Sequence, residues 1–150
     1  MADVVISSSR REFKANRRSL MMNFDELIAH AKNVLAPRQI ASNAWAGSVA
    51  AALLSESGNV YTGVCIDTCS GMGFCAEHAA IAAMITAGES KIVKIVSIGE
   101  NGIYPPCGRC REFICQINDS NIDAEVMVAS DKIVKLSYLL PYRWERFEGH

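Results

Sequence analysis

Helical and strand-like segments alternate along this chain in the order α-β-β-α-β-α-β-β. The helical segments run from Asn23 to Leu35, over residues 76–87 and over residues 108–117. The strand-like segments cover residues 48–54, 60–66, 91–98, 125–129 and 133–136. Because strands interleaved with helices build a sheet with helices packed on it, this order predicts a layered α/β domain with a mixed sheet.

Cap and turn residues mark the ends of several of these segments. Asn23 is a good N-cap, and Glu26 lies three residues later, at the spacing of a capping box. Ser57-Gly58-Asn59 separates two strand-like runs and indicates a hairpin turn. Residues 67–74 hold two Gly and a Ser, which favours a loop.

Length and charge limit the class of protein. The chain has 150 residues, half of them apolar, which fits one domain with a real core. A formal net charge of −1 gives no overall field to attract nucleic acid or an anionic membrane. No apolar run approaches the roughly 18 residues of a membrane helix, and the N-terminus lacks the apolar core of a signal peptide. We therefore expect a cytoplasmic protein without a nucleic-acid or membrane partner.

Residues 1–22 differ from the rest of the chain. The stretch RREFKANRR, from Arg10 to Arg18, carries five positive charges and one Glu. Such a run is typical of a nucleic-acid-binding or targeting arm, or simply of a solvated extension. We favour the extension, because the run is short and the domain is not basic. The predicted organisation is an N-terminal extension without fixed structure over residues 1–22 and a folded domain over residues 23–150.

Three of the six cysteines lie at the starts of two predicted helices. Cys75 begins one helix, and Cys107 and Cys110 straddle the start of the next. Thiolates gain there from the positive end of the helix dipole, and two of them three residues apart can hold one metal ion. Clustered cysteines in a reducing compartment bind metal or do chemistry more often than they form disulfides. Because a structural zinc site uses four protein ligands and a catalytic one keeps a position for water, three ligands favour catalysis.

The residues around these cysteines suit a reaction with water. Glu77, two residues after Cys75, is placed to take a proton from water and hand it on without binding the metal. Zinc with three thiolates carries a net charge of −1, and Arg109 or His78 could donate to a ligand sulfur and offset it. The segments C-A-E and, 32 residues later, P-C-G-R-C match the zinc-deaminase signature of Cys or His, x-Glu, then Pro-Cys-x-x-Cys.

From about residue 24 to 147 the chain resembles the small cytidine deaminases, and the blasticidin S deaminase branch in particular. The resemblance rests on four segments: Cys75-Ala76-Glu77, Pro106 to Arg111 (PCGRCR), Thr62-Gly63-Val64 after the second strand begins, and Leu139 to Pro141 (LLP). It implies a three-layer α/β/α fold with a five-stranded mixed sheet, and a homotetramer (or dimer) whose active sites borrow residues from neighbours. It also implies one Zn²⁺ per chain on Cys75, Cys107 and Cys110, with Glu77 as the catalytic proton shuttle. A first ligand that is Cys and not His indicates the free-nucleoside branch.

The departures from that family bear on the substrate. Nucleoside-type members carry Asn-x-Glu where this chain has Cys65-Ile66-Asp67, and a substrate group left without its partner costs about 1–3 kcal/mol. The family's aromatic before the first-strand Val aligns with Gly47, with Trp45 two residues earlier, and His78 replaces the usual Arg. We expect Cys65, Asp67, Ala76 and Trp144 to be the substrate-binding residues, with Trp144 acting as a tail anchor at a subunit interface or as a wall of a neighbour's pocket. The predicted reaction is hydrolytic deamination of a cytosine nucleoside or analogue, of cytidine, deoxycytidine or blasticidin S type.

Three other interpretations remain open on the sequence. Cys107 and Cys110 could be a redox dithiol, which leaves Cys75 and Glu77 unexplained. A structural zinc could recruit His78 or Cys69 as its fourth ligand. A zinc-stabilised binding module that has lost catalysis would explain the altered Asn-x-Glu position. Cys115 is expected to pack in the core.

Overall fold

The computed structural model describes residues 22–144, and the predicted extension therefore lies almost wholly outside the described residues, as does the end of the predicted domain. Four helices and one 3-10 helix are present in this part of the chain: α2 (Phe24–Val34), α3 (Ala76–Thr86), α4 (Gly108–Gln116), η1 (Asp119–Asp123) and α5 (Leu136–Leu139). The strands of this part are β1 (Arg38–Ala41), β2 (Ala44–Ser55), β3 (Val60–Thr68), β4 (Ile92–Gly99), β5 (Gly102–Ile103), β6 (Glu125–Ala129) and β7 (Lys132–Lys135).

The sheet is mixed, as predicted, and the described residues contribute seven strands to it, not five. Its main path runs β1-β2-β4-β6-β7, while β3 pairs with β2 and β5 pairs with β4. The β4–β6 pair is parallel and the other pairs are antiparallel. The five predicted strands are all present; β1 and β5 are the additional ones. They were missed because β1 is four residues long and exposed throughout, and β5 has only two residues.

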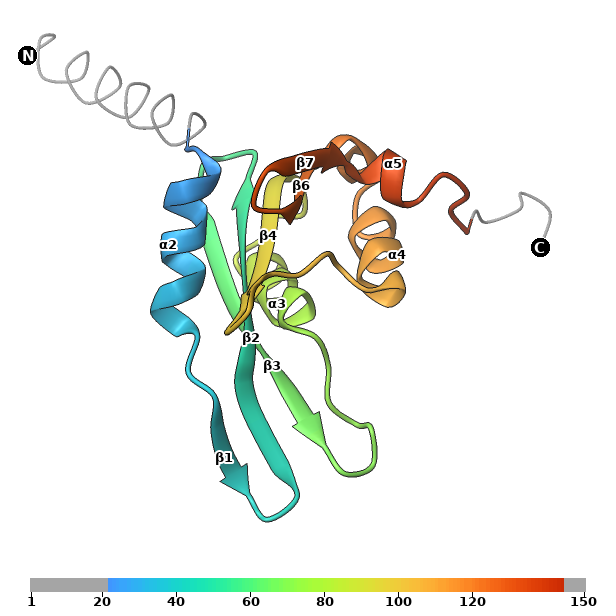
Figure 1. Cartoon of the computed structure of the whole chain (residues 1–150). Helices are drawn as coiled ribbons and strands as arrows, with labels where there is room; N and C mark the ends of the chain where they lie inside the picture. Colours follow the sequence, from blue (N-terminus) through green and yellow to red (C-terminus); the bar gives the residue numbers. More distant parts are fainter. Residues whose placement is uncertain (1–21, 145–150) are drawn as a thin grey trace, which may run out of the picture.

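Helices cover both faces of the sheet, which confirms the three-layer α/β/α arrangement (Figure 1). Strand β2 alternates: Ala50, Ala52 and Leu54 face the core under α2, whereas Ala51 and Leu53 face the core shared with α3 and α4. All five side chains are fully buried. A strand buried on both faces loses the apolar-polar alternation of a surface strand, which explains the continuous apolar run over residues 49–54.

The predicted cap and hairpin are confirmed by hydrogen bonds. The Asn23 side chain accepts from the Glu26 amide, and the Glu26 carboxylate accepts from the Asn23 amide, both at 2.9 Å. The Ser55 amide donates to the Asn59 carbonyl at 2.9 Å, closing the β2–β3 turn. Local hydrogen bonding thus fixes the start of α2 and the register of the hairpin.

A glycine lets helix α3 approach strand β3 unusually closely. A Cβ added at Gly63 would lie 2.3 Å from the Ala80 backbone nitrogen and 2.6 Å from the Ala79 Cβ, so only a glycine fits there. Ala76 and Ala80 are fully buried at this contact. The alanine-rich sequence of α3 therefore serves close packing, and this packing fixes the position of Cys75 at the head of the helix.

Helix α4 is tied to the start of β4 by one buried amide. The Asn121 side chain accepts from the Ile92 amide at 2.7 Å and donates to the carbonyls of Ser90 and Ile114 at 3.0 and 2.9 Å. Asn121 is fully buried in η1. These bonds tie helix α4, which has Cys107 and Cys110 at its start, to the sheet. None of the helices in residues 22–144 is long and apolar enough to cross a membrane.

Candidate functional site

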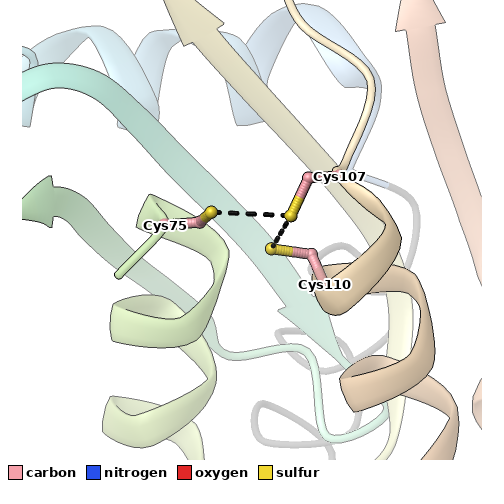
Figure 2. Close-up of side chains that lie close together, drawn as sticks. All are labelled: Cys75, Cys107 and Cys110. Atoms are coloured by element: carbon pink, nitrogen blue, oxygen red, sulfur yellow. Dashed lines mark hydrogen bonds between the residues drawn. The ribbon is translucent and has the colours of Figure 1, made fainter. Parts of the chain in front are cut away.

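The three cysteines singled out in the sequence come together, with their sulfurs facing one another from two helix starts (Figure 2). Cys75 is the N-cap of α3 and Cys107 is the N-cap of α4, and neither side chain makes a capping hydrogen bond. The Sγ atoms of Cys75 and Cys107 are 3.6 Å apart, and those of Cys107 and Cys110 are 3.4 Å apart. All three ligand atoms lie within 4.8 Å of one another.

This donor set fits zinc. Three soft sulfur ligands suit Zn²⁺, and thiolates about 2.3 Å from a tetrahedral ion stand roughly 3.8 Å apart, close to the spacings found here. The electrostatics also call for a cation. Burial, together with Glu77 and the neighbouring thiols, raises the pKa of Cys75 and of Cys110 above the ordinary value. Burial would also raise the pKa of Cys107, but hydrogen bonds from Cys110 and Cys75 lower it.

Glu77 stands beside the three sulfurs without belonging to the metal-ligating group. It lies in the first turn of α3, and only 4 % of its surface is exposed. It lines the same pocket as Cys75 and Cys107. A carboxylate in that position can exchange protons with a molecule held in the pocket, because it is next to the metal position but free of it.

The two residues expected to offset the thiolate charge take different positions. His78 Nδ1 is 3.3 Å from Cys110 Sγ, and its ring stacks on Phe113 at a centroid distance of 4.5 Å and an interplanar angle of 8°. Burial and then the Arg109 charge lower the pKa of His78. Arg109 is exposed and lines the pocket. The structure therefore places His78 against the sulfur of Cys110 and Arg109 in the exposed part of the pocket lining.

A pocket of about 410 Å³ opens onto the cysteines. Besides residues of the site it is lined by the middle of β2, the end of β3, Ser97 of β4, the loop leading to α3, and the segment after β5. Cys65, Asp67 and Ala76, all expected to bind substrate, line it. Cys65 and Ala76 are buried, whereas Asp67 is exposed. Trp144 does not line it: 65 % of its surface is exposed, and its amide donates to the Glu112 carboxylate at 3.2 Å.

The thiol of Cys65 is already engaged within the chain. Its Sγ accepts from the Val49 amide at 3.3 Å and lies 3.1 Å from Ser48 Oγ. Ser48 Oγ and Cys65 Sγ also approach Asp67 Oδ2, at 3.5 and 3.6 Å. The polar groups at this side of the pocket are therefore a hydroxyl and a carboxylate joined through a thiol.

Several pocket residues could not be recognised from the sequence, namely Ser48, Phe74, Ser97 and Tyr104. Ser48 carried a weak signal, because it is the polar residue that starts an otherwise apolar strand. Tyr104 precedes Cys107 by three residues, but a residue in a loop has no periodicity to show where its side chain points. Gly47 has a φ of +81° and Trp45 is half-exposed outside the lining, so neither supplies an aromatic wall there.

Two alternatives lose support from the geometry. Among the described residues, the metal-ligating group contains neither His78 nor Cys69, and the Cys69 thiol instead lies 3.7 Å from Asn43 Oδ1. A redox function would need only Cys107 and Cys110. It would not explain why the sulfur of Cys75 also lies next to them. Cys115 packs in the core cluster beneath α3 and α4, which confirms its predicted place.

Curated relatives of the chain are cytidine deaminases. No protein-family model matches it. A cytidine deaminase of Mycobacterium tuberculosis is 31% identical over 77 residues, which are 50% of this chain and 58% of the relative. A probable cytidine deaminase of Dictyostelium discoideum is also 31% identical over 77 residues, covering 49% of this chain and 52% of the relative. The chain thus spans little more than half the length of these relatives.

Solved structures extend the likeness over most of the chain. The cytidine deaminase of Mycobacterium leprae superposes with a TM-score of 0.68 at 27% identity, covering 81% of this chain and 99% of that one. The enzyme of Mycobacterium tuberculosis gives a TM-score of 0.69 at 23% identity, covering 83% and 99%. That of Burkholderia pseudomallei gives 0.65 at 25% identity, covering 82% and 100%. The chain therefore has the fold of cytidine deaminases, and about half of it is similar in sequence to curated members of that family.

Proposed function

We propose that this chain is a zinc-dependent hydrolytic deaminase that converts a cytosine nucleoside or analogue into its uracil form and releases ammonia. The observation that carries the proposal is the buried Glu77 beside three converging cysteine sulfurs, at the end of a pocket large enough for a nucleoside. A binding module would need the metal site but not an acid next to it. Members of the family with this fold are named for the same activity.

The metal would be held by Cys75, Cys107 and Cys110, one ion per chain. When bound, zinc supplies Lewis-acid chemistry: it makes water acidic enough to react near neutral pH. Glu77 takes the proton of the attacking water on a carboxylate oxygen. It gives that proton to the ring nitrogen next to the reacting carbon. It then takes the remaining proton from the oxygen that has been added to the carbon and gives it to the amino group, which leaves as ammonia. A carbon–oxygen bond forms and a carbon–nitrogen bond breaks, with no change of oxidation state.

His78 and Arg109 would offset the negative charge of three thiolates and Glu77. The Nδ1 atom of His78 is within hydrogen-bond distance of Cys110 Sγ, and stacking on Phe113 holds the ring in that orientation. Arg109 brings a positive charge to the pocket wall. Both groups would lower the electron density on the sulfurs and so strengthen the pull of the ion on water.

The pocket lining around Asp67 bears on the substrate. Asp67 and Ser48 offer a carboxylate and a hydroxyl where a substrate hydroxyl or amine could donate, while the Cys65 thiol is already engaged. A substrate of blasticidin S type fits this altered lining, because it need not present the ordinary sugar. Cytidine and deoxycytidine remain the other candidates.

We also propose that the protein is a cytoplasmic homotetramer. Ile40, Trp45 and Met72 are exposed apolar side chains, 53 %, 42 % and 82 % accessible. They lie on the β1–β2 hairpin and the β3–α3 loop, at the end of the sheet that projects beyond the helices (Figure 1). Apolar side chains gathered on one end of a molecule favour burial against another copy. Trp144 would lie at such an interface or in a neighbour's pocket.

A substrate panel tests the reaction. Zinc-loaded protein is incubated with cytidine, deoxycytidine, blasticidin S and cytosine, and ammonia release is followed together with the absorbance change of the ring. We expect turnover of at least one nucleoside or analogue and none of it after chelation of the metal. A zinc-loaded protein that releases no ammonia from any of them would instead support the binding module.

A further inference from the structure

We infer that Tyr104 binds the substrate by stacking its ring on the planar heteroaromatic ring of the substrate. This inference rests on the proposed function. It adds to the proposed site a substrate-binding residue that is neither a metal ligand nor the proton carrier. Of the described residues that line the pocket, Phe74 and Tyr104 are the aromatic ones. Each leads into the metal position, because Cys75 follows Phe74 directly and Cys107 follows Tyr104 by three residues.

The backbone of Tyr104 is fixed to the sheet. Its amide donates to the Ser97 carbonyl of β4 at 2.9 Å, directly after the short strand β5. Ser97 is itself buried, 3 % exposed, and lines the pocket. The backbone of Tyr104 is therefore hydrogen-bonded to a central strand. A residue held in this way is preorganised for binding, which a residue in a free loop is not.

The ring of Tyr104 lies against β4 because Gly99 has no side chain. A Cβ added at Gly99 would lie 2.4 Å from Tyr104 Cε2 and 3.2 Å from Tyr104 Cδ2. The residue is nonetheless 37 % exposed. An aromatic ring backed by a strand and still open toward a pocket is a platform for a flat ligand.

The non-aromatic residues of the lining do not offer a flat surface for the face of the substrate ring, so an aromatic side chain is the group that can bind it. The charged groups of the lining are Asp67, Glu77 and Arg109, and each acts on a polar or charged part of the ligand. A cytosine-type ring presents two large apolar faces, and stacking on an aromatic side chain binds such a face without depending on what hangs on the ring. The substrate class is therefore a planar six-membered heteroaromatic ring with variable substituents.

The test compares Tyr104→Ala, Tyr104→Phe and Gly99→Ala with the native protein, and Tyr138→Ala serves as a control on an exposed tyrosine outside the lining. Zinc content, kcat and KM are measured with a substrate that the native protein deaminates, and binding of the uracil product is measured by calorimetry. We expect Tyr104→Ala to raise KM and the product Kd about tenfold or more, with zinc content unchanged and kcat within about threefold. Tyr104→Phe keeps the ring and should stay within about threefold in KM.

Gly99→Ala gives an independent check, because its new methyl group displaces the ring while Tyr104 itself is retained. It should raise KM in the same direction as Tyr104→Ala, whereas Tyr138→Ala should match the native protein. The proposal is overturned if Tyr104→Ala leaves KM and product binding unchanged. It is equally overturned if only kcat or zinc content falls, or if Tyr104→Phe is as harmful as Tyr104→Ala.

Failure of the proposed function would look different. A native protein that binds cytidine in calorimetry but releases no ammonia would contradict the deaminase, and a tenfold weaker binding by Tyr104→Ala would still support the stacking role. A native protein that neither binds nor converts any pyrimidine of the panel would contradict the stacking role as well.

Discussion

At the scale of single residues, Asn121 shows how strongly one side chain can be required. Its amide is fully buried and makes three hydrogen bonds, to the Ile92 amide and to the Ser90 and Ile114 carbonyls. Removing the amide leaves buried polar groups without partners, which costs more than the bonds contribute when formed.

We therefore predict that Asn121→Ala lowers the free energy of unfolding by about 2–5 kcal/mol, because up to three buried polar groups lose their partner. Urea denaturation followed by circular dichroism measures it. Asn101→Ala, at an exposed turn, is the matched control and should change the value by less than about 0.5 kcal/mol. Equal stability of the two variants would contradict the role of the buried amide.

The residues of the candidate site that lie at helix starts could be predicted from the sequence. Cys75, Cys107 and Cys110 lie at helix N-termini, and their convergence was predicted from the match to the zinc-deaminase signature. Ser48 and Tyr104 could not be found in the same way, because whether each side chain faces the pocket depends on strand pairing and on the path of a loop. Tyr104 in particular lies where it does because Gly99, on another strand, leaves room for its ring.

At the scale of elements, the contact between α3 and β3 fixes the position of the helix that holds Cys75 and Glu77. Gly63 permits that contact, since a Cβ there would lie 2.3 Å from the Ala80 nitrogen. Cys75 and Glu77 stand at the same end of the helix, on either side of Ala76, whose carbonyl oxygen would lie 2.7 Å from that Cβ. Any displacement of α3 from the sheet therefore displaces a proposed metal ligand and the proposed proton carrier together.

We predict that Gly63→Ala destabilises the fold by about 1–3 kcal/mol, the usual cost of overpacking, and also weakens zinc binding. Gly108→Ala is the control for stability, because a Cβ at Gly108 meets no heavy atom within 4 Å. Unfolding by urea and competition with a zinc-binding dye give the two quantities. Native-like stability and zinc affinity in Gly63→Ala would show that α3 does not need this close approach.

The turn between β2 and β3 and the end of α3 are joined by one carboxylate. Burial on its own would raise the pKa of Glu89, but hydrogen bonds from Ser55, Asn59, Tyr61 and Ser57 outweigh it and lower the pKa to about 2. The Glu89 carboxylate accepts from Tyr61 Oη at 2.7 Å and from Asn59 Nδ2 at 2.6 Å. The charged form is thus favoured in the folded state.

The pH dependence follows from that lowered pKa. Because the folded protein holds the Glu89 proton less tightly than the unfolded chain, its contribution to stability is complete above about pH 5 and is lost as the pH falls toward 2. The difference in unfolding free energy between the native protein and Glu89→Gln should shrink over that range. It should shrink less in the Tyr61→Phe background, which lacks one donor. A difference that stays constant from pH 6 to pH 2.5 would contradict the account.

The elements themselves could be predicted to different degrees. Strands β2, β3, β4 and β6, which carry the core, were found because apolar runs mark them. Strand β7 is mostly exposed and was found from the short run that follows the turn Ser130-Asp131-Lys132. Strands β1 and β5 carry no such pattern: each pairs at one end of a longer strand, through backbone hydrogen bonds that side-chain periodicity does not report. The 3-10 helix η1 also went unpredicted, since its polar sequence DSNID reads as a loop although Asn121 within it is buried.

At the scale of the whole molecule, the metal position links two helices on the same face of the sheet. Cys75 belongs to the start of α3, and Cys107 and Cys110 belong to the start of α4 (Figure 2). An ion bound there would act as a cross-link between segments 32 residues apart in the sequence. Metal binding to the folded state alone also stabilises that state by mass action.

We expect removal of zinc to lower the free energy of unfolding by about 3 kcal/mol when the free zinc concentration had been some hundred times its Kd. Thermal unfolding before and after chelation measures the shift. Cys110→Ser should show a much smaller shift on chelation, since it lacks one of the three ligands, while Cys69→Ser should behave as the native protein. A native protein whose unfolding temperature does not respond to chelation would contradict a metal site at these cysteines.

The central claim is that Glu77 carries protons beside a metal held by three cysteines, and Glu77→Gln tests it most directly. Zinc content and ammonia release are measured on the same preparations of this variant and of the native protein. The account predicts about one zinc per chain in both and a loss of turnover of about 10²-fold or more in the variant. Turnover within tenfold of the native protein, or loss of the metal from the variant, would contradict it.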